Sequence, residues 1–360
     1  NFVSLINERK DQQKTQLTSN NGTSKNTSSE SSSSLISTPM SSPSKEPSRV
    51  NLANSFHQRI RSQIIKAVSD NTNSQRRYNK NISANNSVNN NSEATILSNT
   101  RIITKTKIGD SIINDIIENK QIIAVDCEGV NLGVKGTATL VQIAILPPKD
   151  MPFIFPKIYL FDVFVNPEFF EGSLKKLLES EEIIKIIHDV RNDAAALYFQ
   201  HGITIKNVFD TQVAHAVIQQ QNQGKPAYKA KYISLNLLCE SYGGPVNPKK
   251  DQLKKYYRKD QRFWSHRPLT DEMILYAAHD VYSLIPNVYL NVVQQIRPEY
   301  LPLLNQLNHE AIYSRINPDE IKQIRRQRKN DMEVTDLKQK LFNSDTKKVI
   351  LSNREIRLLR

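Results

Sequence analysis

Cysteines, long apolar runs and common cofactor-binding motifs are scarce or missing in this sequence. Two cysteines in 360 residues argue against a disulfide-stapled secreted scaffold, and no Cys/His cluster has the spacing of zinc ligands. No apolar run reaches the roughly 18 residues that a membrane span needs, and no apolar run follows a charged start as in a signal peptide. A G-x-x-x-x-G-K-[ST] phosphate loop is also absent. We therefore expect an intracellular protein, cytoplasmic or nuclear, with buried thiols at Cys127 and Cys239.

The first hundred residues have the composition of a disordered arm. Residues 29–44 are rich in serine and residues 71–99 in asparagine, so they bury too little apolar surface to offset the entropy of ordering. An amphipathic pattern at 53–68 predicts an isolated helix, and the plainer interpretation is a marginal helix. The chain starts at Asn1 rather than Met, which fits a fragment or a processed form.

The positive charge is concentrated at the two ends of the chain. The formal net charge is +13; residues 1–100 hold 12 Lys/Arg and 6 Asp/Glu, and residues 301–360 hold 13 and 8. Residues 101–300 are nearly neutral, with 24 and 22. A basic balance favours polyanion partners. The arm and the tail are also the segments through which protein partners could bind.

Hydrophobic periodicity divides the rest of the chain into a domain at 101–300 and a helical basic extension at 301–360. Strand-like runs occur at 121–127, 138–146, 153–163 and 183–187. Helical patterns occur near 108–119, 169–179, 190–201, 211–220, 233–243 and 270–296, and Pro318 opens a further helix. Strands followed by alternating strands and helices predict an α/β fold with a mixed sheet flanked by helices.

Acidic residues follow or interrupt these elements in a pattern typical of metal sites. Asp126 and Glu128 end a buried strand in IIAVDCEG, and a strand turns alternate side chains to one face. Tyr276 and Asp280 in ILYAAHDV are four apart, which places them on one helix face. Asp193 lies in HDVRNDAAAL. Carboxylates without matching basic partners repel one another, and hard cations such as Mg²⁺ or Mn²⁺ remove that conflict.

The three motifs VDCEG, HDVRND and YAAHD resemble those of the DEDD superfamily of 3′–5′ exonucleases, in the RNase D-like branch with tyrosine in the last motif. The resemblance covers residues 101–300. It is stronger still, in stretches such as KGTATLVQIA and RFWSHRPLTDEM, to the group of exonuclease 3′–5′ domain-containing protein 1 and Egalitarian. That group is associated with RNA binding, and some of its members have lost catalytic carboxylates. The resemblance implies an RNase H-like architecture.

The resemblance also implies roles for the five residues. Asp126, Glu128 and Asp280 would hold a first Mg²⁺ or Mn²⁺ ion, and Asp126 would bridge to a second. Asp193 would bind the second ion, directly or through water. Tyr276 would orient the attacking water; the competing interpretation is a core tyrosine whose hydroxyl is satisfied nearby. No other cofactor is expected.

A basic, aromatic segment at 249–267 is the candidate nucleic-acid contact. Lysines and arginines would neutralise phosphates, and aromatic rings could stack on unpaired bases. The alternative is a solvated helix whose aromatic residues, Phe263 and Trp264 above all, pack on the core. A basic cluster at 325–329 is a second candidate. The residues proposed to contact nucleic acid are Lys249, Lys250, Lys254, Lys255, Tyr256, Arg258, Lys259 and Arg262.

Other polar residues near the motifs are assigned structural roles. Asp189 fits a helix N-cap, and Asp210 is predicted to cap the following helix. His188, His215 and His279 are predicted to be structural. The stretch GVKG at 133–136 predicts a hairpin turn beside the site.

Three functions remain open from the sequence. The first is a metal-dependent 3′–5′ exonuclease acting on single-stranded nucleic acid, RNA in preference to DNA. The second is an RNA-binding adaptor of small-RNA or mRNA pathways with weak or no nuclease activity. The third is an acidic metal protein without a polynucleotide partner, which the basic aromatic segment argues against.

Overall fold

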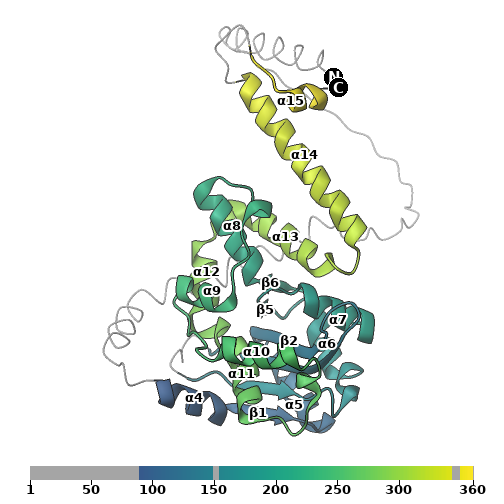
Figure 1. The fold of residues 1–360 in the computed structure, drawn as a ribbon, viewed down its shortest axis with the longest axis vertical. Helices are drawn as coiled ribbons and strands as arrows, with labels where there is room; N and C mark the ends of the chain where they lie inside the picture. Colours follow the sequence, from purple (N-terminus) through teal and green to yellow (C-terminus); the bar gives the residue numbers. More distant parts are fainter. Residues whose placement is uncertain (1–88, 149–153, 343–348, 360) are drawn as a thin grey trace, which may run out of the picture. The chain divides into compact units, whose positions relative to one another are not determined.

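A six-stranded mixed sheet lies in the larger of two compact units, Arg49–Ile321 (Figure 1). The computed structural model describes residues 89–148, 154–342 and 349–359. The strand order is β1-β4-β3-β2-β5-β6; β3 is antiparallel to both neighbours and the other pairs are parallel. The strands are β1 (Thr100–Ile103), β2 (Ile123–Val130), β3 (Thr137–Ile145), β4 (Ile158–Phe161), β5 (Lys185–Ile187) and β6 (Val208–Asp210).

Helices follow or precede most of the strands. They are α4 (Asn89–Ser98), α5 (Thr106–Glu118), α6 (Ser173–Glu179), α7 (Arg191–His201), α8 (Thr211–Gln223), α9 (Leu235–Tyr242), α10 (Lys250–Lys259), α11 (Asp271–Tyr282), α12 (Tyr289–Gln295), α13 (Leu301–Tyr313), α14 (Pro318–Phe342) and α15 (Asn353–Leu358). Short 3₁₀ turns occur at Pro167–Phe170, Ala227–Lys229, Phe263–Ser265 and Pro298–Tyr300, and a π-helical turn at Leu284–Val288. The predicted α/β fold with a mixed sheet flanked by helices is therefore confirmed.

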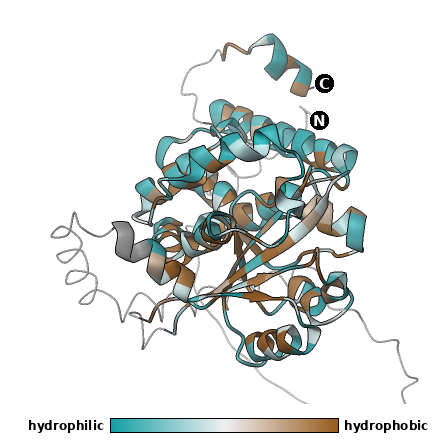
Figure 2. Cartoon of the chain, turned by 60° about the horizontal axis from the view of Figure 1, so that its bottom comes forward, coloured by the Kyte–Doolittle hydropathy of each residue, from teal (hydrophilic) through white to brown (hydrophobic). Residues whose placement is uncertain are grey.

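The sheet separates two apolar cores because side chains of a strand alternate between its faces. Ile123, Val125 and Cys127 of β2 belong to the rear core, with α5, α6 and α7. Ala124 belongs to the front core, with α8, α9, α11 and α12. Figure 2 shows apolar strands between helices with hydrophilic outer turns. Asp126 is two residues after Ala124, so its side chain lies on the same, front face of the sheet. Helix α11 packs against this face, so we expect the acidic motifs to meet there.

The last part of the segment predicted to be a disordered arm is a helix in the structure. Asn89–Ser98 forms α4, although residues up to 99 are rich in asparagine. Ile96 is 1% exposed and joins the front core, and Glu93 forms an ion pair with Lys249 at 2.7 Å. Tertiary contact therefore overrides a composition typical of disorder. Residues 1–88, including the predicted helix at 53–68, lie outside the described residues.

The sequence pattern did not predict two short strands, β1 and β6, or a break within one helix. β1 and β6 have four and three residues, too few for a visible alternation. The helix predicted at 270–296 is divided into α11 and α12 by the π-helical turn. Pro286 lies in that turn, and proline cannot donate the backbone hydrogen bond that an α-helix needs. The predicted strand at 153–163 is confirmed only for β4.

The smaller unit comprises Asn1–Ser48 and Lys322–Arg360, and its described part is helical. Asp319 and Glu320 lie in the first turn of α14, as predicted for a helix opened by Pro318. In the smaller unit, Ser352 and Glu355 form a capping box at the start of α15, and Lys340 contacts Glu355 at 2.9 Å. Among the described residues, no helix combines the length and apolarity needed to span a bilayer.

Candidate active site

Strand β2 places Asp126 and Glu128 on the front face of the sheet. The strand continues into a hairpin with β3, as the GVKG stretch predicted. The register shifts at Gly129, directly after Glu128. A Cβ atom at Gly129 would lie 2.1 Å from the carbonyl oxygen of Thr137, so only glycine allows the two strands to approach here. The bulge thus follows the second carboxylate immediately.

Helix α11 places Tyr276 and Asp280 one turn apart, both buried. Thr270 caps the helix by accepting a hydrogen bond from the backbone N–H of Met273 at 3.3 Å. Ala277 and Ala278 are fully buried, and their small side chains let the helix lie close to β2 and β3. The helix therefore presents its carboxylate directly to the strand carboxylates.

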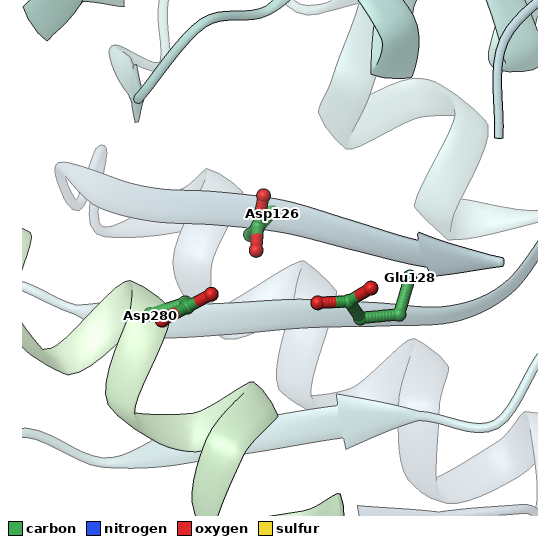
Figure 3. A group of neighbouring side chains, drawn as sticks. All are labelled: Asp126, Glu128 and Asp280. Atoms are coloured by element: carbon green, nitrogen blue, oxygen red, sulfur yellow. The ribbon is translucent and has the colours of Figure 1, made fainter. Parts of the chain in front are cut away.

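The carboxylates of Asp126, Glu128 and Asp280 converge (Figure 3). One oxygen from each lies within 4.8 Å of the others. Burial, followed by the charge of Asp280, raises the pKa of Asp126 to about 7. Burial, followed by Asp126, raises the pKa of Glu128 well above its ordinary value. Asp280 Oδ1 is buried and has no hydrogen-bond partner. The cluster therefore has the composition and the unsatisfied oxygen of a cation site.

Asp193 lies in the first turn of α7 and outside this group of three. Its side chain is 6% exposed. Burial, then the charge of Asp126, raises the pKa of Asp193 well above its ordinary value. The fourth acidic residue thus interacts electrostatically with the cluster and does not share its closest contacts.

The carboxyl ends of the parallel strands β2, β5 and β6 bring these residues together. Asp193 follows β5, and Asp210 ends β6. As predicted, Asp210 caps α8 by accepting a hydrogen bond from Gln212 N at 2.8 Å. It also accepts bonds from the backbone N–H groups of Asp189 and Val190, both at 3.0 Å. One carboxylate thereby fixes both turns, which explains its burial.

Asp189 was predicted to be a helix N-cap, and this assignment is wrong. The N-cap position of α7 is Val190, which makes no side-chain cap. Asp189 instead has a positive φ of 66° and pairs with Arg191, whose Nη2 lies 2.7 Å from Asp189 Oδ2. The neighbouring turn supplies Asp210 as the acceptor, so no local cap is needed.

The predicted structural roles of the histidines agree with their contacts. His188 lies 3.0 Å from Thr211 Oγ1 and 3.1 Å from the carbonyl of Ile233. Burial, and secondarily Lys250, lowers the pKa of His188 to about 4, so the ring is neutral at pH 7. His215 contacts Tyr242, and His279 contacts Ser283. Cys127 and Cys239 are buried free thiols, as predicted.

The prediction that Lys250 is a surface contact for phosphate is wrong. Its side chain is buried, and Nζ donates a hydrogen bond to Asp280 Oδ2 at 2.6 Å. Nζ also lies 5.3 Å from the centre of the Tyr276 ring. The expectation that the carboxylates have no basic partner is therefore wrong as well. One face of α10 carries Lys250, Leu253 and Tyr257. The helical spacing of the apolar residues Leu253 and Tyr257 could therefore have identified Lys250 as inward-facing.

Tyr276 is surrounded by aromatic rings. Tyr257 and Trp264 have ring centres 6.3 and 5.7 Å from that of Tyr276. Burial raises the pKa of Tyr257 and the neighbouring Tyr276 phenol lowers it, so the two phenols interact. Burial, and then Asp280, raises the pKa of Tyr276 far above its ordinary value, so the hydroxyl remains a donor. Tyr257 is the neighbour that the sequence did not single out, and its ring packs edge-on against that of Tyr276.

The remaining candidate contacts of α10 differ in exposure. Lys249 is engaged by Glu93, and Lys254 is half-buried. Trp264 is buried, as expected, and its carbonyl accepts a hydrogen bond from Thr139 Oγ1 at 2.7 Å. Besides Lys249, the exposed members of the predicted set are Lys255, Tyr256, Arg258, Lys259 and Arg262.

Comparison with known proteins agrees with this geometry. The sequence pattern of the 3′–5′ exonuclease family matches residues 100–298. The chain belongs to this family. Its three motifs place it in the RNase D-like branch of the DEDD superfamily. Residues 100–298 are therefore a domain of the 3′–5′ exonuclease family.

Two curated relatives illustrate the similarity. The Egalitarian protein homolog of Caenorhabditis elegans is 29% identical over 176 residues, which are 47% of this chain and 28% of that protein. The human piRNA biogenesis protein EXD1 is 28% identical over 185 residues, 50% of this chain and 34% of that protein. The chain thus spans about a third of the length of these relatives.

A solved structure shares the fold. The Trypanosoma brucei RNase D–GMP complex matches with a TM-score of 0.50 and 23% identity, over 61% of this chain and 65% of that chain. This likeness confirms the predicted RNase H-like, RNase D-type architecture.

Proposed function

We propose that this chain is a metal-dependent 3′–5′ exonuclease that removes nucleotides from the 3′ end of single-stranded RNA. The observation that carries the proposal is the convergence of Asp126, Glu128 and Asp280 within 4.8 Å on the front face of the sheet. Membership of a metal-dependent exonuclease family supports it. The relatives named for piRNA biogenesis support RNA as the substrate.

The clustered carboxylates are the ligand type that hard divalent cations prefer, and we propose two Mg²⁺ or Mn²⁺ ions. Asp126, Glu128 and Asp280 would hold the first ion, and Asp126 with Asp193 would hold the second. All of these ligands are hard carboxylate oxygens, and the free Oδ1 atom of Asp280 is an available ligand. When bound, such a pair stabilises an attacking hydroxide and the leaving 3′ oxygen.

The other buried residues complete the arrangement. The Tyr276 phenol stays protonated and can donate a hydrogen bond that orients the attacking water. Tyr257 and Trp264 pack against the Tyr276 ring, and these rings exclude bulk solvent. Lys250 offsets part of the negative charge, because its ammonium group contacts Asp280.

The test is degradation of 5′-labelled single-stranded RNA and of DNA of the same sequence, with Mg²⁺, Mn²⁺ or EDTA. We expect stepwise shortening from the 3′ end, faster for RNA, which EDTA, Asp126→Ala or Glu128→Ala abolishes. Glu118→Ala, which removes an exposed carboxylate from α5 behind the sheet, is the matched control and should cut like the wild type. Equal cutting by wild type and Asp126→Ala would reject the proposal, and faster cutting of DNA would reject the RNA assignment.

The adaptor is the second candidate, because Lys250 already pairs with one of the three clustered carboxylates. An adaptor would bind RNA with similar affinity in the wild type and in Asp126→Ala, and would leave the 3′ end intact at millimolar Mn²⁺. The degradation assay and a binding assay on the same oligonucleotide therefore distinguish the two functions.

A further inference from the structure

The connection between α8 and α9 carries a second group of basic and aromatic residues, in the sequence KPAYKAKY at 225–232 (Figure 1). Lys225, Lys229 and Lys231 are exposed, and the segment contains no acidic residue. Tyr228 and Tyr232 are 48% and 60% exposed. Exposed aromatic rings interleaved with lysines are the composition of a surface that binds unpaired nucleic acid.

The backbone of this segment is held at both ends. At its start, Ala227 is buried, and its N–H donates a hydrogen bond to Gln220 Oε1 at 2.7 Å. At its end, the N–H of Ile233 donates to Gln212 Oε1 at 2.9 Å, and the carbonyl of Ile233 lies 3.1 Å from His188 Nε2. The two exposed rings are therefore displayed from a fixed backbone, which lowers the entropy lost on binding.

The same contacts place the segment beside the acidic site. His188 precedes the turn that carries Asp193, and the Tyr232 ring centre lies 6.1 Å from that of His188. The pKa of the Tyr232 hydroxyl is raised, first by surrounding protein atoms and then by Asp189, while Lys250 lowers it. The hydroxyl thus lies within electrostatic range of groups on both sides of the site, although the ring is exposed.

We propose that residues 225–232 form a second binding surface for the single strand, on the Asp193 side of the site. Tyr232 would stack on a base next to the reacting end, and the three lysines would contact phosphates farther along the strand. This surface lies on a different element from α10. Helix α10 carries the exposed residues Lys255, Tyr256 and Arg258, and its buried Lys250 contacts Asp280 of the site. The direction in which the strand lies on this surface rests on the proposed function. The binding test of the surface does not depend on catalysis.

Binding is measured in an Asp126→Asn background in EDTA, by fluorescence anisotropy of a labelled single-stranded oligouridylate of about 12 nucleotides. We expect Tyr232→Ala to weaken binding about 5-fold or more, in the range of a lost base stack. Lys225→Ala, Lys229→Ala and Lys231→Ala together should lower the slope of log affinity against log salt by up to about 2, because each lost phosphate contact contributes about 0.7. The control removes three exposed lysines behind the sheet, Lys105, Lys107 and Lys176, with the same change of net charge.

The outcomes separate this surface from the catalytic proposal. Unchanged affinity in Tyr232→Ala, together with a salt slope equal to that of the control triple variant, would overturn the surface. So would failure of the Asp126→Asn protein to bind the oligonucleotide. The expected binding losses without any nuclease activity in the wild type would support the surface and reject the exonuclease. Equal melting temperatures for all variants show that the losses are not caused by unfolding.

Discussion

At the residue scale, the acidic cluster combines groups that are unfavourable together without a cation. Asp126 has a pKa of about 7 in the folded protein against an ordinary 3.8. The folded state therefore holds a proton that the unfolded chain releases between about pH 4 and 7. Stability contributed by this proton is present below that window and is lost as pH rises through it.

The first prediction follows from this sign. Asp126→Asn removes the titrating charge and keeps the shape, so it should stabilise the metal-free protein, and more at pH 8 than at pH 5. The difference between the two gains should be about 1 kcal/mol or more. Urea unfolding in EDTA at both pH values measures it. The pKa of His188 is lowered, so its contribution to stability changes with pH in the opposite direction. Because His188 is present in both proteins, this contribution cancels in the comparison. A gain that is the same at both pH values would contradict the prediction.

A second prediction concerns Lys250. Lys250→Met removes the ammonium group that contacts Asp280 at 2.6 Å. Metal-free stability should fall by a few kcal/mol, because breaking a buried ion pair leaves an unpaired carboxylate. Mn²⁺ should bind at least about threefold more tightly by titration calorimetry, because Asp280 is no longer shared and the site is more negative. Lys249→Met, which breaks the surface contact with Glu93, is the control. Equal or weaker Mn²⁺ binding by Lys250→Met would refute competition between the ammonium group and the ion.

A third prediction separates the two interpretations of Tyr276. Tyr276→Phe keeps the ring packing and removes the hydroxyl. If the hydroxyl orients water, the rate at saturating RNA should fall by roughly 10²-fold with little change in melting temperature. Tyr257→Phe removes the neighbouring phenol and leaves the Tyr276 hydroxyl, so its effect should be smaller. Wild-type turnover in Tyr276→Phe would assign the phenol to core packing alone.

At the element scale, a buried ion pair fastens the segment that precedes α11 to the sheet. Arg267 donates to both oxygens of Asp162, at 2.6 and 2.7 Å, and to the carbonyl of Thr139 at 3.1 Å. Thr139 in turn donates to the carbonyl of Trp264. Trp264 packs beside Tyr276, so this pair supports the wall of the site from a distance.

The fourth prediction is that Asp162→Asn lowers the free energy of unfolding by about 2–4 kcal/mol, because it weakens a bidentate pair that is shielded from water. Glu181→Gln, which weakens the exposed pair with Lys206, should change it by less than about 0.5 kcal/mol. Chemical denaturation of both variants makes the comparison. Similar losses in the two would show that the Arg267 pair contributes no more than a surface contact.

At the scale of the whole molecule, the net charge of +13 is carried mostly by the two ends, while residues 101–300 are nearly neutral. The proposed affinity for a single strand must then come from local basic groups. The fifth prediction is that Lys254→Ala with Lys255→Ala and Arg258→Ala weakens RNA binding and lowers the log–log salt slope by up to about 2. Neutralising the basic cluster at 325–329 should have a milder effect. A slope equal to that of the Lys105, Lys107 and Lys176 control would leave α10 as a solvated helix face.

The sequence by itself determined the kind of fold and the identity of the acidic residues. Alternation in β2 placed Asp126 and Glu128 on one face, and the four-residue spacing placed Tyr276 beside Asp280, because both relations depend only on local backbone geometry. The buried thiols and the Asp210 cap followed from equally local rules. The roles of these side chains in catalysis, and the division of the chain at residues 100 and 300, stay predictions.

Only the tertiary structure decided which groups meet. Lys250 reached Asp280, 30 positions away, and Tyr257 reached Tyr276, although the local pattern of α10 looked like a solvated basic surface. Asp210, at the end of a different strand, accepts a hydrogen bond from the backbone N–H of Asp189. Ile96 packs in the front core, and the asparagine-rich stretch around it is a helix. Such contacts join residues far apart in the chain, and their energies depend on burial, which no local periodicity encodes.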